Sequence, residues 1–275
     1  MSQIKRIYLM GSSGLLYQCA SLLQKISPDH EQVILETGHT PSDSRRAMKH
    51  SALTGSKAEL MDILQQENEE AVLFSINNPY IIPADLVCKQ NFSMINLHHA
   101  LLPAHPGRNA EAWTIFDGDR SAGITWHRID SGTDSGNILI QKSVSVTDRT
   151  TSISLLKELN KLAVEALAEL MPLDVLIENP GIKQSISAKR TVRLAKEIPA
   201  GGVLDPEWDE KKVSRFLRAM DYSLLNVLGK PSIVIQNTSH QILFYKIISK
   251  SEKTTVNSDQ MLISKDNLQF LLTLS

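Results

Sequence analysis

An asparagine and a histidine lie two residues apart in the run Met94-Ile95-Asn96-Leu97-His98-His99. This run is typical of a β-strand, in which side chains alternate between two faces, so we expect Asn96 and His98 to share a face. An asparagine amide can donate to a developing oxyanion, and a histidine can exchange a proton near neutral pH. The pair alone also fits a structural asparagine at the strand end and a hydrogen-bonded core histidine.

An acidic residue, Asp134, lies in a glycine-flanked loop, residues 130–136, between two later strand-like runs. A carboxylate in such a loop can orient a histidine or a water molecule, and it can accept a proton from an attacking nucleophile. The Asp-Ser-Gly sequence is also common in ordinary turns. An asparagine, a histidine and a later aspartate on the rims of one sheet form a more specific pattern, which indicates a site that handles protons.

Alternating strands and helices are expected to position these residues. This order predicts an α/β fold with a Rossmann-like, mostly parallel sheet and helices on both of its faces. In such sheets ligands bind beyond the carboxyl ends of the strands. The predicted strands are Ile4–Met10, Gln32–Glu36, Ala71–Ile76, Ser93–His99, Gly123–Ile129 and Asn137–Val146, and the predicted helices are Leu15–Ile26, Ser56–Glu69, a helix that opens at Pro83, and Ser152–Leu170.

A smaller module is expected at the C-terminal end. From about Ser185 the chain is polar and linker-like until Pro199-Ala200-Gly201-Gly202. A predicted helix and three β-rich runs follow, so we expect an α+β or OB-like module. The predicted domains are therefore 1–190 and 199–275. The elements of the second domain are Glu210–Met220, Ser232–Gln236, Gln241–Ile248 and Gln269–Leu274.

Composition narrows the classes of function. Hydrophobic residues make up 42% and charged residues 21% of 275 residues, with a formal net charge of −1. This balance is typical of a folded protein, and it lacks the basic field that non-specific nucleic-acid binding requires. Cys19 and Cys88 lie in apolar stretches and are expected to be core residues rather than a disulfide or metal ligands. With no export signal or membrane span in the pattern, we expect a cytoplasmic protein.

Two stretches resemble the signatures of the folate-dependent formyltransferases, the family of glycinamide ribonucleotide and methionyl-tRNA formyltransferases. They are Ile95–Gly107 (INLHHALLPAHPG) and Gly123–Gly136 (GITWHRIDSGTDSG). The resemblance implies catalytic roles for Asn96, His98 and Asp134. It is clearest over about residues 71–170, weaker around 199–233 and generic in the first 60 residues. It requires no metal, and the residues show no cluster of metal ligands.

The same resemblance implies a formyl donor, 10-formyltetrahydrofolate, and residues that contact it. The segment Ser75–Pro83 (SINNPYIIP) is similar to the loop that grips the pterin through backbone groups and an apolar wall. Residues near the strand edge are candidates for contact with the acceptor: His99, Arg108 and Asn109. The candidates for the donor are Ser75, Ile76, Asn77, Tyr80, Ile81, Ile82, Pro83, Ile129, Asp130 and Thr133.

Departures from the family pattern bear on the acceptor. Ala100 stands where many members carry serine, and His105 stands where the tRNA enzymes tend to have a basic residue. At Arg108-Asn109 and Trp126 the sequence more closely resembles the sequences of sugar-nucleotide formyltransferases and of the formylation domains of peptide synthetases. We therefore expect a small biosynthetic amine rather than methionyl-tRNA. It could be an amino sugar nucleotide, or an amino acid or hydroxyornithine that is free or carrier-bound, and the oligomeric state stays open.

Other classes of function remain as alternatives. Water could replace the amine, which would make the protein a formyltetrahydrofolate hydrolase. A non-enzymatic folate-binding scaffold is a second alternative, although the intact Asn96, His98 and Asp134 argue against it. An NAD(P)-dependent oxidoreductase is a third. The turn Gly11-Ser12-Ser13-Gly14 could hold a phosphate at a helix N-terminus, but it lacks the third glycine of the dinucleotide motif, so we favour a structural turn.

Overall fold

The computed structural model describes residues 4–185, 191–225 and 227–275. By its packing the chain divides into two compact units, each built from several stretches of sequence. The first unit comprises Met1–Pro106, Gly123–Ser143 and Leu159–Val192, and the second comprises Gly107–Ala122, Val144–Glu158 and Arg193–Ser275.

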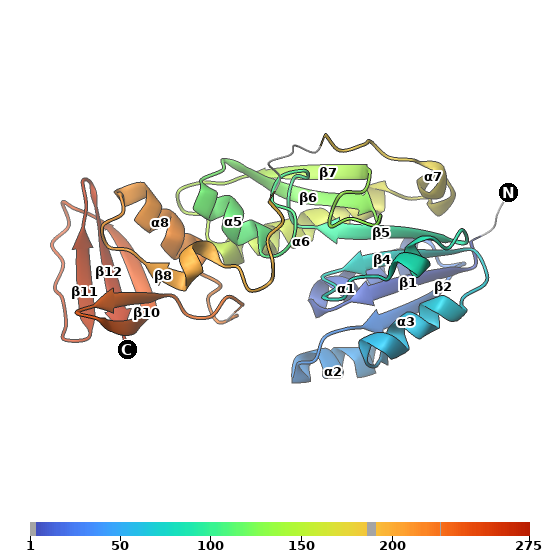
Figure 1. Ribbon diagram of the computed structural model, residues 1–275, viewed down its shortest axis with the longest axis horizontal. Coiled ribbons are helices and arrows are strands. Elements are labelled where there is room, and N and C mark those ends of the chain that lie inside the picture. The colour runs from blue at the N-terminus through green and yellow to red at the C-terminus, as the bar shows by residue number, and fades with distance from the viewer. Residues whose placement is uncertain (1–3, 186–190, 226) are drawn as a thin grey trace. The chain divides into compact units, whose positions relative to one another are not determined.

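A seven-stranded sheet in the order β3-β2-β1-β4-β5-β6-β7 forms the centre of the first unit (Figure 1). The strands from β1 to β5 pair in parallel, and β6 pairs antiparallel with β5. The predicted Rossmann-like, mostly parallel sheet is confirmed. The strands are β1 Arg6–Gly11, β2 Glu31–Glu36, β3 Leu53–Thr54, β4 Ala71–Ile76, β5 Phe92–His98, β6 Ser121–Arg128 and β7 Ile138–Ser145.

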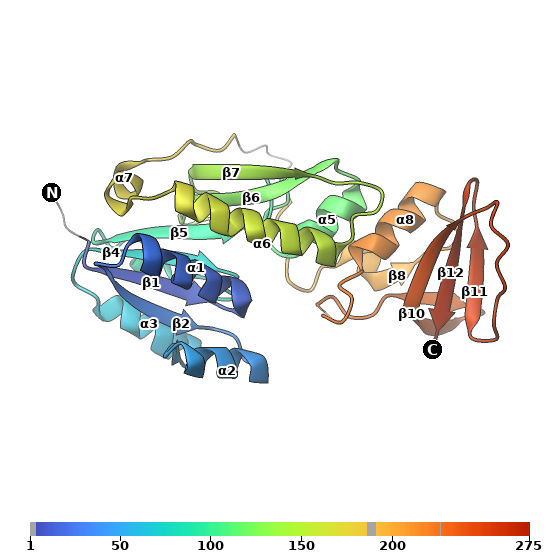
Figure 2. The ribbon, with the colours of Figure 1, turned by 180° about the vertical axis from the view of Figure 1, so that it is seen from behind.

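Helices cover both faces of this sheet, as expected. Figures 1 and 2 show α1 (Ser13–Ile26) and α6 (Ser152–Glu169) over one face and α3 (Lys57–Gln66) over the other. The short α4 (Ala84–Val87) follows β4, and α7 (Leu173–Glu178) follows α6. The sequence pattern missed α2 (Pro41–Lys49), because only two of its residues are buried and it has no apolar stripe.

The core of the first unit lies on both sides of β4, which is buried at every position. Trp126 of β6 is fully buried, and its ring packs edge-on against Phe74 of β4 with 5.9 Å between the ring centroids. Its Nε1–H donates to the Ala163 carbonyl of α6 at 3.1 Å. Trp126 is therefore a core residue on the face that α6 covers. Its hydrogen bond satisfies a polar atom that would otherwise be buried alone.

The turn after β1 requires a glycine. Gly11 has a φ of 155°, and a Cβ at this position would lie 1.7 Å from the Ile76 carbonyl oxygen. The Ser12 hydroxyl donates to the Asn77 carbonyl at 3.1 Å. This turn therefore joins the ends of β1 and β4 through close backbone packing.

The second unit is an α+β module, in agreement with the expectation for the C-terminal end. It contains α5 (Ala110–Asp117), α8 (Glu210–Ala219) and a five-stranded sheet in the order β11-β12-β10-β9-β8. Its core includes the fully buried rings of Phe216 and Phe270. The strands are β8 Val203–Leu204, β9 Ser232–Ile235, β10 Thr238–Ser249, β11 Gln260–Ser264 and β12 Leu268–Leu274, and Pro199–Gly202 forms a 3₁₀ turn before β8.

The two cysteines differ from each other. Cys19 is buried in α1, and burial raises the pKa of its thiol to about 12. Cys88 is exposed, so the prediction that it is a core residue was wrong. It follows the single-turn α4, in which Leu86 is the buried residue, and this leaves Cys88 on the outer side. In the part of the chain that the structure describes, no helix is long and apolar enough to cross a membrane.

The turn after β5 is held by the fully buried Thr125 of β6. Its hydroxyl donates to the Ala100 carbonyl at 2.6 Å and accepts the Leu102 N–H at 3.1 Å. Gln141 of β7 donates to the same hydroxyl at 2.8 Å and to the Leu102 carbonyl at 2.9 Å. The backbone that leaves β5 beyond His98 is therefore fixed by side chains of the two antiparallel strands.

We predict that Thr125→Val lowers the free energy of unfolding by about 1–3 kcal/mol, because a buried N–H and a buried carbonyl lose their shared partner. Thr125→Ser keeps the hydroxyl and should retain more stability, although valine matches threonine better in shape. Urea unfolding of both variants, followed by circular dichroism, provides the measurement. A valine variant as stable as the parent would show that this hydroxyl does not hold the turn.

Candidate active site

The structure brings Asn96, His98 and Asp134 together in the first unit. Asn96 and His98 come from the carboxyl end of β5, and Asp134 comes from the loop between β6 and β7. The Asp134 carboxylate lies 3.4 Å from Asn96 Nδ2 through Oδ1 and 3.5 Å from His98 Nδ1 through Oδ2. The side chains of His98 and Asp134 are 7% and 12% exposed, so the carboxylate and the imidazole interact largely away from bulk water.

The orientation of the His98 ring follows from its second contact. His98 Nε2 lies 2.8 Å from the backbone carbonyl of His105. A carbonyl oxygen only accepts hydrogen bonds, so Nε2 carries the hydrogen in this contact. Nδ1 is then the ring atom that faces the Asp134 carboxylate and can exchange a proton there.

A second histidine, His127 of β6, belongs to the same cluster, although the sequence patterns did not predict it. It lies opposite Asn96 in the β5–β6 pairing. Its Nδ1 is 2.8 Å from the Arg128 carbonyl, so in the neutral ring Nε2 is the acceptor, and Asn96 Nδ2 lies 3.2 Å from Nε2. His127 thus directs the donor end of the Asn96 amide. Only the strand register could have revealed it, because strand alternation alone does not show which residue of β6 faces Asn96.

The cluster is not arranged as a metal centre. Within residues 4–185, 191–225 and 227–275, no group of three histidine, cysteine or acidic side chains is placed to hold a metal ion. Its three contacts of 3.4–3.5 Å join a carboxylate to an amide and to two imidazoles. Such groups can donate hydrogen bonds and transfer protons without a metal.

The Asp134 loop has an unusual backbone. Asp134 has a φ of 49°, a left-handed conformation that aspartate tolerates better than most residues. Two residues later, a Cβ on Gly136 would lie 1.9 Å from the Arg128 carbonyl oxygen. The Asp-Ser-Gly sequence therefore meets the steric demands of this loop, in addition to supplying the carboxylate.

The structure places the predicted donor loop beside the cluster. Ser75 and Ile76 end β4 and are buried, and Ser75 pairs with Asn96. Asn77 is left-handed with a φ of 50°, and its side chain donates to the Ser13 hydroxyl at 3.0 Å. These polar groups and backbone lie at the carboxyl edge, where the fold is expected to bind ligands.

The remaining donor candidates form a partly apolar border. Tyr80, Ile82 and Ile129 pack partly buried against the core, whereas Ile81 is 80% exposed. This mixture fits an apolar wall for a flat heterocycle. The Asp130 carboxylate accepts hydrogen bonds from Ser135 and Gly132 of its own loop, Thr133 is exposed, and Pro83 precedes α4. Contact of these residues with a donor stays a prediction.

The acceptor candidates belong to different units. Strand alternation puts His99 on the face opposite His98, next to Asn160 of α6. Its Nε2 is buried, and burial lowers the pKa of His99 to about 4 despite the favourable contact with Asn160. Arg108 and Asn109 belong to the second unit, where the Arg108 N–H donates to Arg193 and Asn109 precedes α5. Their contact with an acceptor stays a prediction.

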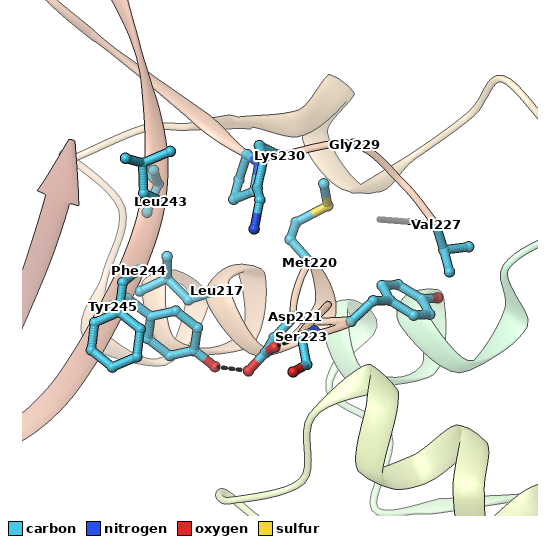
Figure 3. A pocket seen from close by; sticks show the side chains of 13 residues that line it. Leu217, Met220, Asp221, Ser223, Val227, Gly229, Lys230, Leu243, Phe244 and Tyr245 are labelled. Atoms are coloured by element: carbon cyan, nitrogen blue, oxygen red, sulfur yellow. Dashed lines mark hydrogen bonds between the residues drawn. The ribbon is translucent and has the colours of Figure 1, made fainter. Parts of the chain in front are cut away.

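A separate cavity lies within the second unit (Figure 3), between the end of α8 and β10. Its wall includes Met220, Lys230 and Phe244, and Tyr245 donates to the Asp221 carboxylate at 2.9 Å. The cavity volume of about 50 Å³ leaves room for a few water molecules. It is well below the roughly 300 Å³ of a small ligand pocket, so it does not compete with the cluster as a substrate site.

The chain is similar to known proteins over a region that includes Asn96, His98 and Asp134. Residues 21–171 match the family described as formyl transferase. Over 173 residues the chain is 35% identical to the GDP-perosamine N-formyltransferase of Brucella melitensis biotype 1, covering 60% of this chain and 65% of that protein. The enzyme of the same name from Brucella abortus matches to the same extent. The chain therefore spans about 65% of the length of these curated relatives.

Two solved structures share the fold along nearly the whole chain. WlaRD, a sugar 3N-formyl transferase solved in the presence of dTDP and 5-N-formyl-THF, has a TM-score of 0.72 at 18% identity, covering 99% of this chain and 98% of that chain. An N-formyltransferase from Helicobacter canadensis, in complex with folinic acid and dTDP-3-aminofucose, has a TM-score of 0.73 at 16% identity, covering 99% and 100%. At these identities the likeness establishes the fold.

The lowered pKa of His99 predicts a pH dependence of stability. The unfolded chain binds a proton at His99 below about pH 6.5, whereas the folded chain does so only below about pH 4. The free energy of unfolding should therefore fall as the pH drops from about 6.5 to 4. His99→Gln removes this contribution, so its urea midpoint should fall less over that interval. His39→Gln, at an exposed position, is the comparison, and equal slopes in both variants would contradict the assignment to His99.

Proposed function

We propose that this chain, which belongs to the formyl transferase family, transfers a formyl group from 10-formyltetrahydrofolate to the amine of a nucleotide-linked amino sugar. The observation that carries the proposal is the convergence of Asn96, His98 and Asp134 at the carboxyl edge of β5. An amide donor, an imidazole and a carboxylate within 3.5 Å are the groups that an acyl transfer to an amine needs.

The reaction begins with attack of a neutral amine on the formyl carbon. A carbon–nitrogen bond forms, the formyl oxygen becomes negative and the attacking nitrogen becomes positive. Asn96 Nδ2 supplies a hydrogen bond to this oxyanion, and a protonated His98 nearby supplies a favourable positive charge. The 3.4 Å contact from Asn96 to Asp134 is long for a hydrogen bond, so an oxyanion can replace it at little cost.

A proton transfer completes the reaction. Asp134 takes a proton from the attacking nitrogen, while its other oxygen faces His98 Nδ1 at 3.5 Å. Collapse of the intermediate breaks the bond between the formyl carbon and N10 of the folate. The net result moves one proton from the amine to N10, and the products are the formamide and tetrahydrofolate.

The donor site is proposed at the loop after β4 and the loop after β6. The buried Ser75 and Ile76 lead into this region beside Asn96, and Ile129 is anchored by donation of its N–H to the Met94 carbonyl at 2.9 Å. Backbone groups of the first loop can hydrogen-bond a pterin, and Ile82 and Ile129 can pack against its ring. The donor would then hold its formyl group at the end of β5.

The proposed acceptor is supported by the relatives. Both curated relatives are named for formylation of a GDP-linked amino sugar, and one solved structure holds dTDP-3-aminofucose. A small nucleotide-linked sugar is also compatible with a net charge of −1, which provides no general attraction for a tRNA backbone. We therefore favour amino sugar nucleotides as the acceptor over aminoacyl-tRNA, free amino acids and carrier-bound amines.

The reaction is tested with a panel of GDP- and dTDP-linked amino sugars in the presence of 10-formyltetrahydrofolate. We expect release of tetrahydrofolate together with a sugar product that is heavier by one formyl group in place of a hydrogen. Omission of the amine should stop the release. Formate release without any amine would instead identify a hydrolase, and formylation confined to methionyl-tRNA would overturn the proposed acceptor.

The catalytic assignment predicts that Asp134→Asn lowers kcat by about 10²–10³-fold, because an amide of the same shape cannot accept the proton. Asn96→Ala and His98→Ala should lower kcat by a similar factor. Steady-state kinetics and thermal unfolding measure activity and fold together. Asp62→Asn, at an exposed position of α3, is the matched control and should keep the parent rate. Near-parent turnover by Asp134→Asn would contradict the mechanism.

A further inference from the structure

A segment after α7, residues 179–185, runs along the Asp134 loop. Ile138 and Ile182 exchange two backbone hydrogen bonds, each 2.8 Å long, and the Asn137 side chain donates to the Pro180 carbonyl at 2.8 Å. We call residues 179–185 the strap. It pairs with the chain just after the loop, so it lies where it can control the conformation of the loop.

The strap is itself tied to the sheet. Arg128, the last residue of β6, directs Nη2 at the carbonyls that end α7, those of Leu176, Ile177 and Asn179. These contacts satisfy carbonyls that have no partner inside the helix. Arg128 follows His127 directly in β6. The strap and the candidate cluster are therefore both held by side chains of the same strand.

One side chain of the strap reaches the loop. Gln184 is 6% exposed, and its Nε2 donates to the carbonyl of Asp134 at 2.9 Å and to the carbonyl of Gly136 at 2.7 Å. Both neighbours are acceptors, so the chemistry fixes which end of the amide faces them. Gln184 therefore uses both of its N–H groups on the two carbonyls that flank Ser135.

These two bonds act on the backbone that carries the carboxylate. Asp134 is in the left-handed region, and Gly136 is packed directly against the Arg128 carbonyl. The loop therefore has a close backbone contact on its β6 side, and Gln184 binds the carbonyls on either side of Ser135. The backbone that carries the Asp134 side chain is thus bound by a residue that lies 50 positions away in the sequence.

We propose that Gln184 is a positioning residue that holds the Asp134 carboxylate against His98 and Asn96, a role that rests on the proposed formyl transfer. It acts through Asp134 and has no direct part in the reaction. A carboxylate that is free to rotate out of the cluster still belongs to a folded protein, but it is misplaced for proton transfer. A displacement of about 1 Å can lower the rate by up to 10²-fold.

The test compares Gln184→Met, which keeps the length of the side chain and removes both donors, with Lys183→Met. Lys183 is the neighbouring strap residue and is exposed, so its variant is the matched control. We expect Gln184→Met to lower kcat by about 10–10²-fold while the KM values for donor and acceptor change little. Gln184→Glu should show the same loss, because a carboxylate has no N–H to donate.

A double-mutant cycle separates positioning from general support of the fold. If Gln184 acts through Asp134, then Gln184→Met should cause no further loss of kcat in an Asp134→Asn background. Losses that multiply in the double variant would overturn the proposal. So would parent kcat in the Gln184→Met enzyme with its fold intact.

A measurement that does not depend on turnover tests the role of Gln184 separately from the proposed formyl transfer. The imidazole nitrogen NMR signals of His98, assigned with His98→Gln, report the neighbouring carboxylate. We expect these signals to shift in Gln184→Met and to stay unchanged in Lys183→Met. An absence of any shift would overturn the role of Gln184 whether or not the protein formylates an amine. A shift in a protein that formylates no amine would leave the positioning in place and contradict the proposed function alone.

Discussion

The carboxylate of Asp134 lies within 3.5 Å of polar atoms from Asn96, His98 and His127, which belong to two different strands. A largely buried carboxylate is costly unless neighbouring groups donate to it, so its stability depends on where those groups lie. The carboxylate is carried on a loop, whereas its partners are on strands. Much of the local structure can be understood as the means of holding that loop against the sheet.

The antiparallel pair formed by β5 and β6 supplies the fixed side of this arrangement. Its register puts His127 opposite Asn96 and Thr125 opposite His98. Thr125 then holds the turn that leads to the His105 carbonyl, which in turn accepts from His98 Nε2. One pairing therefore orients the amide through His127 and the chain beyond the imidazole through Thr125.

Periodicity and composition were sufficient to predict the mostly parallel sheet with six of its seven strands, and the α+β module with three of its five. The two-residue strands β3 and β8 are too short to show a pattern, and β11 was also missed. Strand alternation and the family signatures singled out Asn96, His98 and Asp134, which the structure then brings together. These patterns do not identify His127, because its role depends on the register between strands whose paired residues are about 30 positions apart. They do not identify Gln184 either, because it lies outside every predicted strand and helix and contacts a loop 50 residues earlier.

The neighbouring residues His98 and His99 have the same side chain but lie in different environments. Two adjacent imidazoles repel each other when both are charged, so the charge on one lowers the proton affinity of the other. His99 lies on the face covered by α6, and burial lowers its pKa to about 4, which keeps it neutral near pH 7. Asp134 faces the other imidazole, that of His98, with its carboxylate 3.5 Å from Nδ1. Strand alternation thus puts one imidazole in a buried environment that disfavours its charge and the other beside a carboxylate.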